Sequence, residues 1–548
     1  MKKKFLSSIL CLSMVLSMAA CGSGASGQQG IANGTGATQT KTTESKAVEG
    51  EATEIAADED PITIVVEVYD RGNMNETYGT CIDNKWVTLF KEAVLEELNI
   101  DLQYMAIPRS GDATQLQTLM AAGNEPDIFF TYSADQFVKW ANEVVLADLT
   151  PYMDSNAGQK LQEALGKDIL SYGVVNGKQY AINGVRDNLG NYASFIRKDM
   201  LDAVGVELDE LNGHYALTPS ELEDALLKIK NAGLCDYPFA MMNAPQKYCQ
   251  IEGAFLVDES VDSEDAQKNA NSIFFNIDGD KEAFRFLNKC YNEGLINPDF
   301  ALYKDENIKE MVSSGQAAFW CCNYWNYTAE AEALYSVEHD AEIVAVEITQ
   351  EDGTPARYTC NTPVAAYAMV SSECENVEAA LSLIHWFLTS DTAHLLSWHG
   401  IEGEHYKVDA DGDYVAIDTD YNTADRITVN DLNILSNSDK CSGYGTDDFE
   451  RIYRKQNEGL VDERIIQATI DGYNIATSEG KFPTPVVNAT IDALSEYAAE
   501  LTENKDNLVV GSIMAPVDEF DTVYDAYLKI YMEEGGSQVA EQRLEALK

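Results

Sequence analysis

The chain has 548 residues, and at about 150 residues per domain this length predicts two to four folded units. Hydrophobic residues make up 45 % of the sequence and charged residues 24 %, which is typical of globular proteins and excludes a disordered or fibrous chain. The 91 acidic residues outnumber the 38 basic ones, so the formal charge is −53. A surface this negative repels phosphate backbones and anionic lipid headgroups. We therefore expect no nucleic-acid partner and no direct docking on lipid.

The first 20 residues are typical of a secretory signal peptide. Three lysines precede an apolar run, Phe5–Met18, which is shorter than the about 20 residues that span a bilayer. The end of this segment, Met18–Cys21, resembles a bacterial lipobox, although Met18 stands where the usual residue is leucine. That resemblance implies that Cys21 receives diacylglycerol and palmitate and becomes the mature N-terminus. The alternative is a plain signal peptide cleaved near Ala20.

Residues 21–60 are predicted to form a flexible tether. They are rich in small and polar residues and contain no aromatic side chain, so they cannot bury enough apolar surface to fold. A coil of this length spans roughly 35 Å on average. No later run of the sequence is apolar enough over a sufficient length to suggest a membrane span. We expect a globular body held at the extracellular face of the bacterial cytoplasmic membrane.

Cysteine and histidine patterns give no sign of a metal or redox centre. Nine cysteines remain after Cys11 and Cys21, an odd number that cannot all pair within the chain, and none forms a C-x-x-C motif. The six histidines include no tight cluster of metal ligands. We expect no metal and no cofactor.

The first folded part alternates strands with helices, which predicts a parallel sheet covered on both faces. Ligands of such sheets bind beyond the carboxyl ends of the strands. The expected strands are residues 62–68, 102–107 and 127–132, and the expected helices are residues 86–98, 113–122 and 134–143.

The same rule selects five candidate ligand-binding residues. Tyr69, Asp70 and Arg71 follow the first expected strand, and Tyr132 and Asp135 follow the third. Capping of the next helix is an alternative role for Asp135.

A second α/β segment follows. Thr218 is expected to cap a helix that has Pro219 at its first position and Glu221 in a capping box. Further expected strands are residues 179–182, 192–196 and 364–370, and further helices are residues 198–204, 281–293 and 377–389.

Five stretches in their order along the chain resemble bacterial extracellular solute-binding proteins of the sugar type (family 1), the receptors of ABC importers. Each motif is weak alone, but together, after a lipobox, they cover nearly all of residues 61–548. The stretches are Leu116–Ile128, Tyr180–Ile182 with Phe195–Asp199, Tyr291–Phe300, Gly315–Trp325 and Gly400–Tyr406.

This resemblance implies an α/β, two-lobe, periplasmic-binding-protein-like fold of type II, a hinged clamshell with the ligand cleft between the lobes. Lobe 1 is expected over residues 61–183 and 364–400, and lobe 2 over residues 184–363. Residues 401–548 are expected to complete lobe 2 and the hinge.

The resemblance also implies a function. We expect a monomeric, lipid-anchored receptor that captures a carbohydrate, most simply an oligosaccharide, and delivers it to ABC permease subunits. The alternatives are the same fold binding a peptide or another polar solute, a sensor's accessory subunit, or a surface carbohydrate-active enzyme. The sequence contains no nucleophile elbow, phosphate loop or metal-binding histidine pair, so catalysis is not expected.

Sugar sites combine flat aromatic platforms with carboxylates, amides and arginine that bind hydroxyls. By family position, Trp325 is expected to lie under a sugar ring with Asn323 bonding a hydroxyl, although a packed helix start is an alternative; Trp320 and Trp386 are expected in the core.

The polar connector at residues 183–191 is expected to cross between the lobes. Its candidate ligand-binding residues, with the first residue of the next strand, are Arg186, Asp187, Asn188 and Tyr192. A solvated hinge without ligand contacts is the alternative.

Glu402 is the last candidate. On a strand it would share a face with Glu404, as a pair of glycosidase carboxylates would. A structural turn is the simpler interpretation, and contact with the cleft is the next alternative.

The acidic segment Asp409–Asp413 has two interpretations. Alternating carboxylates suit Ca²⁺, but glycine stands at position four rather than six and no glutamate stands at position twelve. An acidic turn between two strands fits the pattern better. The calcium loop that many large relatives carry after the helix at residues 219–230 is missing here.

Overall fold

The computed structural model describes residues 60–72, 79–186, 190–256, 264–269, 280–356, 359–417, 449–478, 482–483 and 485–548. The predicted signal peptide, Cys21 and nearly all of the predicted tether therefore lie outside the described residues. Within the described part of the chain, no helix combines the length and apolar character that crossing a bilayer requires.

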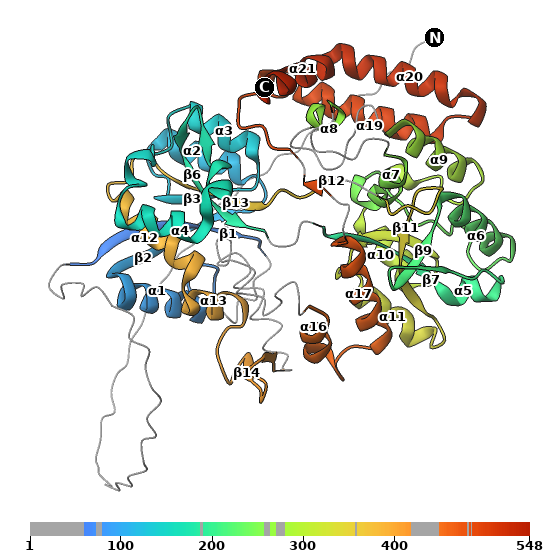
Figure 1. Cartoon of the computed structure of the whole chain (residues 1–548), viewed down its shortest axis with the longest axis horizontal. Coiled ribbons are helices and arrows are strands. Elements are labelled where there is room, and N and C mark those ends of the chain that lie inside the picture. The colour runs from blue at the N-terminus through green and yellow to red at the C-terminus, as the bar shows by residue number, and fades with distance from the viewer. Residues whose placement is uncertain are drawn as a thin grey trace, which may run out of the picture. The chain divides into compact units, whose positions relative to one another are not determined.

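The first lobe is built on a five-stranded sheet with the order β2-β1-β3-β13-β6 (Figure 1). Strand β1 runs parallel to β2 and β3, whereas β13 runs antiparallel to both β3 and β6. The strands are β1 (Ile62–Asp70), β2 (Ile100–Pro108), β3 (Ile128–Thr131), β6 (Ala181–Val185) and β13 (Val364–Val370).

The three strands that were expected to form a parallel sheet, β1, β2 and β3, do so, and β13 adds an antiparallel neighbour to β3. The first three strands are parallel because helices carry the chain back across the sheet between them. Strand β13 enters only after the chain has returned from the second lobe, so no such crossover fixes its direction. The pattern of alternating strands and helices carries no information about this later insertion.

Both faces of the first sheet are covered, as expected. Ile128 and Phe130 of β3 face one hydrophobic core, and Phe129 between them faces the other. The helices of this lobe are α1 (Lys85–Leu98), α2 (Asp112–Ala122), α3 (Ala134–Asn142), α4 (Asn156–Ser171), α12 (Val377–Thr389) and α13 (Asp391–Trp398).

The second lobe is built on another five-stranded sheet, with the order β10-β7-β11-β9-β8. Strand β7 pairs antiparallel with β10 and β11, and β11 pairs parallel with β9. The strands are β7 (Tyr192–Arg197), β8 (Asp209–Leu211), β9 (His214–Leu217), β10 (Phe319–Asn323) and β11 (Ile343–Ile348).

Helices cover the second sheet, and α19 packs against α9 and α20 (Figure 1). The predicted capping box is present, since the backbone N–H of Glu221 donates to the Thr218 hydroxyl at 3.2 Å and that of Thr218 to the Glu221 carboxylate at 2.8 Å. The helices are α5 (Lys198–Ala203), α6 (Pro219–Asn231), α7 (Cys249–Phe255), α8 (Glu264–Lys268), α9 (Asp280–Asn292), α10 (Asp305–Ser313), α11 (Thr328–Val337), α16 (Phe449–Asn457), α17 (Glu463–Ala476), α18 (Asp492–Glu496), α19 (Ala498–Met514), α20 (Phe520–Tyr531) and α21 (Ser537–Ala546).

The segments that pass between the two sheets are tied to one another. The backbone N–H of Arg186, just after β6, donates to the Pro363 carbonyl just before β13, at 2.9 Å. Gly190 lies so close to the last residue of α17 that a Cβ there would collide with the Ala476 carbonyl. Short strands complete this region and the two lobes: β4 (Val174–Val175), β5 (Lys178–Gln179), β12 (Thr359–Cys360), β14 (Tyr406–Val408), β15 (Tyr414–Ala416) and β16 (Phe482–Pro483), with β12 paired in parallel to β16.

The eight cysteines in the described part of the chain are all buried. The Sγ atoms of Cys249 and Cys321 are 4.0 Å apart. Cys441 lies outside the described residues.

Candidate ligand-binding site

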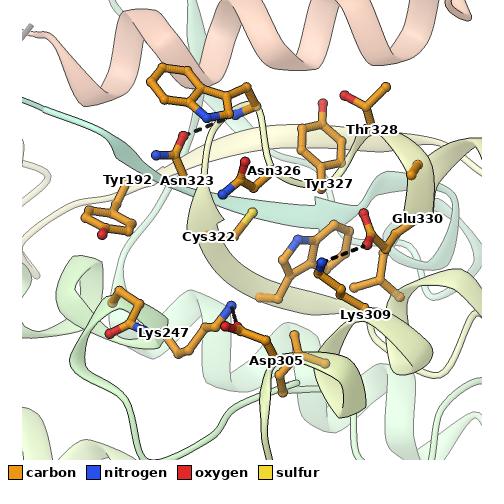
Figure 2. A pocket seen from close by; sticks show the side chains of 16 residues that line it. Tyr192, Lys247, Asp305, Lys309, Cys322, Asn323, Asn326, Tyr327, Thr328 and Glu330 are labelled. Carbon is orange, nitrogen blue, oxygen red and sulfur yellow. Dashed lines mark hydrogen bonds and ion pairs between the residues drawn. The ribbon is translucent and has the colours of Figure 1, made fainter. Parts of the chain in front are cut away.

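A cavity of about 570 Å³ opens on the second lobe at the end of β10 (Figure 2). We refer to it as the second-lobe cavity. Its walls come from the turn after β10, from α10, from the start of α11 and from Tyr192 at the start of β7. Its size lies within the range of about 300–1,000 Å³ that is usual for ligand pockets.

Local sequence positions the aromatic side chain at this cavity. Strand β10 is buried through Cys322 and ends at Asn323, whose carbonyl accepts a hydrogen bond from the Asn326 backbone at 2.9 Å. This turn leaves the Trp325 side chain 46 % exposed, in edge-to-face contact with buried Tyr324 at 4.3 Å between ring centroids. Trp325 is therefore not packed into the start of a helix, which was the alternative. The aromatic residue that is buried at the beginning of α11 is Tyr327.

Charged residues that the sequence did not single out also line the second-lobe cavity. Lys247 pairs with Asp305 at 2.9 Å, and Lys309 pairs with Glu330 at 3.8 Å. Figure 2 shows both pairs at the cavity wall. These pairs could not be predicted from the sequence, because each one joins two elements that are brought together only in the folded protein.

Tyr192 and Trp320 form other parts of the same wall. Burial raises the pKa of Tyr192 to about 12, and the amide of Gln250 donates to its backbone carbonyl at 2.7 Å. Trp320 is almost completely buried and stacks on Phe195 with 5.9 Å between ring centroids, as expected for a core residue.

A second, smaller cavity of about 220 Å³ lies at the first lobe; we refer to it as the first-lobe cavity. Three stretches of the chain that are far apart in the sequence contribute lining residues, namely Arg186, Thr362 and Val486. Tyr132, which is 45 % exposed, and Asp135 also line it. Helix α3 is capped by Ser133, so Asp135 does not serve as the cap residue.

The residues after β1 have different surroundings. Tyr69 is buried, and the Arg109 guanidinium lies over its ring at 4.5 Å and over the Tyr132 ring at 5.4 Å. Asp70 and Arg71 are exposed and line neither cavity. Arg109 follows β2, so the rule that selected the other residues at strand ends would have found it as well.

Arg186 is half-buried, and burial lowers its pKa. Its Nε atom is buried and has no hydrogen-bond partner among the described residues. The neighbouring candidates Asp187 and Asn188 lie outside the described residues.

The segment around Glu402 is a turn, as the simpler interpretation predicted, and does not form the strand that a pair of carboxylates on one face would need. The backbone N–H groups of Glu404 and His405 both donate to the Ile401 carbonyl, so this segment is a tight turn. Its shape follows from buried His405, whose Nδ1 accepts from the Ile401 backbone at 2.9 Å and whose ring packs on Trp86. Glu402 is exposed and lines neither cavity, and Glu404 pairs with Lys85.

The acidic segment Asp409–Asp413 is a turn between the paired strands β14 and β15, as the simpler interpretation predicted. The Lys455 ammonium group contacts Asp409, lies 3.0 Å from Asp411 and lies 2.7 Å from Asp413. Lys455 thus offsets part of the negative charge of this turn, and Arg451 also pairs with Asp413.

The profile of the family described as "Bacterial extracellular solute-binding protein" matches residues 83–394, which is more than half of the chain. Lipoprotein LipO of Bacillus subtilis (strain 168) is 25 % identical over 229 residues, 38 % of this chain and 42 % of that protein. A protein of Niallia circulans described as "Uncharacterized protein in butB 5'region" is 24 % identical over 136 residues, 25 % of this chain and 52 % of that protein. The chain therefore spans about half the length of these curated relatives.

Solved structures share the fold over most of the chain. The alginate-binding protein AlgQ2 without calcium ion has a TM-score of 0.59 and 17 % identity, covering 89 % of this chain and 98 % of that one. An extracellular solute-binding protein from Bifidobacterium longum subsp. infantis has a TM-score of 0.60 and 14 % identity, covering 90 % and 100 %. The N-glycan transport solute binding protein (NgtS) from Streptococcus pneumoniae has a TM-score of 0.57 and 15 % identity, covering 89 % and 99 %.

These likenesses show the two-lobe α/β fold, and the profile match shows the family, whose members are binding proteins rather than enzymes. The resemblance read from the sequence is confirmed: the chain belongs to the bacterial extracellular solute-binding protein family.

Proposed function

We propose that this protein is the receptor of an ABC importer and captures an oligosaccharide for delivery to the permease subunits. The observation that carries the proposal is the exposed indole of Trp325 at the edge of a cavity lined with charged and amide side chains. A flat apolar surface beside hydrogen-bonding groups matches a sugar ring, which has apolar faces and a rim of hydroxyls. The names of structural neighbours, alginate-binding and N-glycan transport, support this chemistry.

The proposed ligand extends from the second-lobe cavity toward the first-lobe cavity. Tyr192 lines the former and Arg186 the latter, and the two side chains are close enough to interact electrostatically. Trp325 and Tyr132 would supply ring faces at the two ends. Binding of one ligand to both lobes would favour their closed arrangement, which is a ligand-driven shift of population.

Attachment to the extracellular side of the membrane through Cys21 is part of the proposal. The likeness to a protein named a lipoprotein supports it. The monomeric state and the predicted lobe boundaries also belong to the proposal.

Replacement of Trp325 by alanine tests the sugar site. We expect a thermal-shift screen of the purified protein against mono- and oligosaccharides to find a glycan that raises the melting temperature, because ligands that bind only the folded state stabilise it. Titration calorimetry of that glycan should give a Kd at least about tenfold higher for Trp325→Ala, since ring stacking is lost. Trp325→Phe, which keeps a flat ring, should retain part of the affinity.

Val517→Ala provides the control, because Val517 is an apolar residue that is 59 % exposed and lines neither cavity. Equal losses in Trp325→Ala and Val517→Ala would contradict the site. If no glycan changes the melting temperature but a peptide or another polar solute raises it, the ligand is not a sugar. The receptor fold would be unaffected by that result.

A further inference from the structure

Arg186 carries a positive charge that no carboxylate of the described residues neutralises. The groups whose charge acts on its guanidinium are the phenols of Tyr132 and Tyr192, and phenols are uncharged at neutral pH. Its Nε is buried without a hydrogen-bond partner among the described residues. Its backbone is fixed by the hydrogen bond to Pro363 at 2.9 Å, so the side chain is held at the first-lobe cavity.

Three other cations at or near the two cavities are paired. Lys247 pairs with Asp305, Lys309 pairs with Glu330, and Arg109 pairs with Asp112 at 3.0 Å.

Asp135 is a carboxylate at the first-lobe cavity, but it does not neutralise Arg186. Its charge acts on Arg543 and on the Tyr367 phenol, and it is not among the groups that act on Arg186. The positive charge of Arg186 therefore faces the cavity without a counter-ion from the part of the chain that the structure describes.

A half-buried charge without a partner is unfavourable, and arginine cannot escape the cost by losing its proton. Burial lowers the pKa of Arg186, but a guanidinium remains charged at neutral pH. An anion entering the cavity would remove the imbalance, and carboxylate and sulfate both accept paired hydrogen bonds from a guanidinium. The formal charge of −53 repels anions from the surface as a whole, so selective capture of one requires a local cation of this kind.

We propose that Arg186 binds an anionic substituent of the ligand, a carboxylate or a sulfate, in the first-lobe cavity, so that the cargo is an acidic oligosaccharide. This inference rests on the proposed function and names its substrate class. Tyr132, exposed beside Arg186, offers a ring face for the sugar that carries the anion.

Pairs of glycans that differ only in charge test the inference. The uronate arm compares tetragalacturonate and a hyaluronan tetrasaccharide with their methyl esters; the sulfate arm compares a sulfated carrageenan tetrasaccharide with its desulfated form. Neutral maltotetraose, cellotetraose and mannotetraose complete the panel. We expect one charged glycan to bind the wild-type protein at least about tenfold more tightly than its neutral partner, the size of a charge-assisted hydrogen bond.

Arg186→Gln should abolish that preference and Arg186→Lys should keep part of it. Lys228→Gln removes one positive charge from an exposed pair on α6 and should leave the preference unchanged. The free Arg186→Gln protein should melt no lower than wild type, because the variant loses an unpaired charge; this separates loss of binding from loss of fold.

Each outcome has one meaning. Binding of neutral glycans with equal or tighter affinity than charged ones would overturn the inference and leave the oligosaccharide receptor intact. A charge preference that survives in Arg186→Gln would also overturn it. Failure of every glycan would overturn the proposed function and this inference with it.

Discussion

The Trp325 indole is held by one buried neighbour. Tyr324 is almost completely buried and contacts the rings of Trp325, Phe449 and Tyr473. Its ring is therefore held in place and supports the indole through an edge-to-face contact. The position of Trp325 just after a strand was readable from the sequence. The contacts that hold it come from α16 and α17, more than a hundred residues later in the chain. Nothing in the sequence indicated these contacts.

Glu252 leads to a prediction about pH. Its side chain is buried in α7, and burial, followed by the negative charge of Asp280, raises its pKa well above the ordinary 4.5, while Lys505 opposes the shift. Between 4.5 and the raised pKa the folded state therefore holds a proton that the unfolded state has released. The contribution of Glu252 to stability is consequently most favourable at or below its ordinary pKa and declines as the pH rises through the raised value.

Glu252→Gln mimics the protonated carboxyl group and should remove this decline. We expect the variant to melt higher than wild type at pH 8, with the two melting temperatures converging near pH 4.5. Differential scanning calorimetry across this range measures both. If the melting temperatures of the two proteins change with pH in the same way, the prediction that the pKa of Glu252 is raised is wrong.

At the scale of elements, the β14–β15 hairpin and α16 are joined by Lys455. The carboxylate oxygens of Asp409, Asp411 and Asp413 lie within 4.8 Å of one another, and the ammonium group contacts all three. Hydrogen bonds from Lys455 lower the pKa of Asp409, and those from Arg451 and then Lys455 lower that of Asp413. Such carboxylates stabilise the fold above their ordinary pKa of 3.8, and the effect is lost as the pH falls through the lowered values.

Lys455→Met should therefore lower the melting temperature at neutral pH and low salt, because the three carboxylates lose the cation that contacts all of them, while Arg451 still pairs with Asp413. The deficit should shrink in about 1 M salt, where the Debye length is roughly 3 Å. It should also disappear at pH values below the lowered pKa values of the aspartates. Lys407→Gln, an exposed lysine on the same hairpin, is the control and should change little; an equal effect of both variants would assign the loss to net charge alone.

Individual elements were more predictable than their pairing. The expected helix at residues 377–389 and strand at residues 364–370 coincide with α12 and β13. Both depend on the spacing of apolar residues within one segment. The direction of β13 depends on where the chain enters the sheet, which the local apolar pattern does not specify.

At the scale of the whole molecule, attachment to the membrane remains a prediction from the first 21 residues. We expect the mature N-terminal peptide to begin at Cys21 and to carry the mass of a diacylglycerol thioether. Metabolic labelling with palmitate should be lost in Cys21→Ala and kept in Cys374→Ala, which changes a buried cysteine. An unmodified N-terminus produced by cleavage near Ala20 would establish a plain signal peptide instead.

The sequence by itself determined the α/β elements, the family and the aromatic residue at the end of β10, because each depends on residues close together in the chain. The export signal is predicted from the same kind of local pattern. The tertiary structure alone decided which side chains meet. Lys247 reaches Asp305, three distant passages line the cavity around Arg186, and Lys455 enters the acidic turn. Capping and periodicity are local interactions, whereas a cavity and its charge balance arise only when packing brings separate segments together.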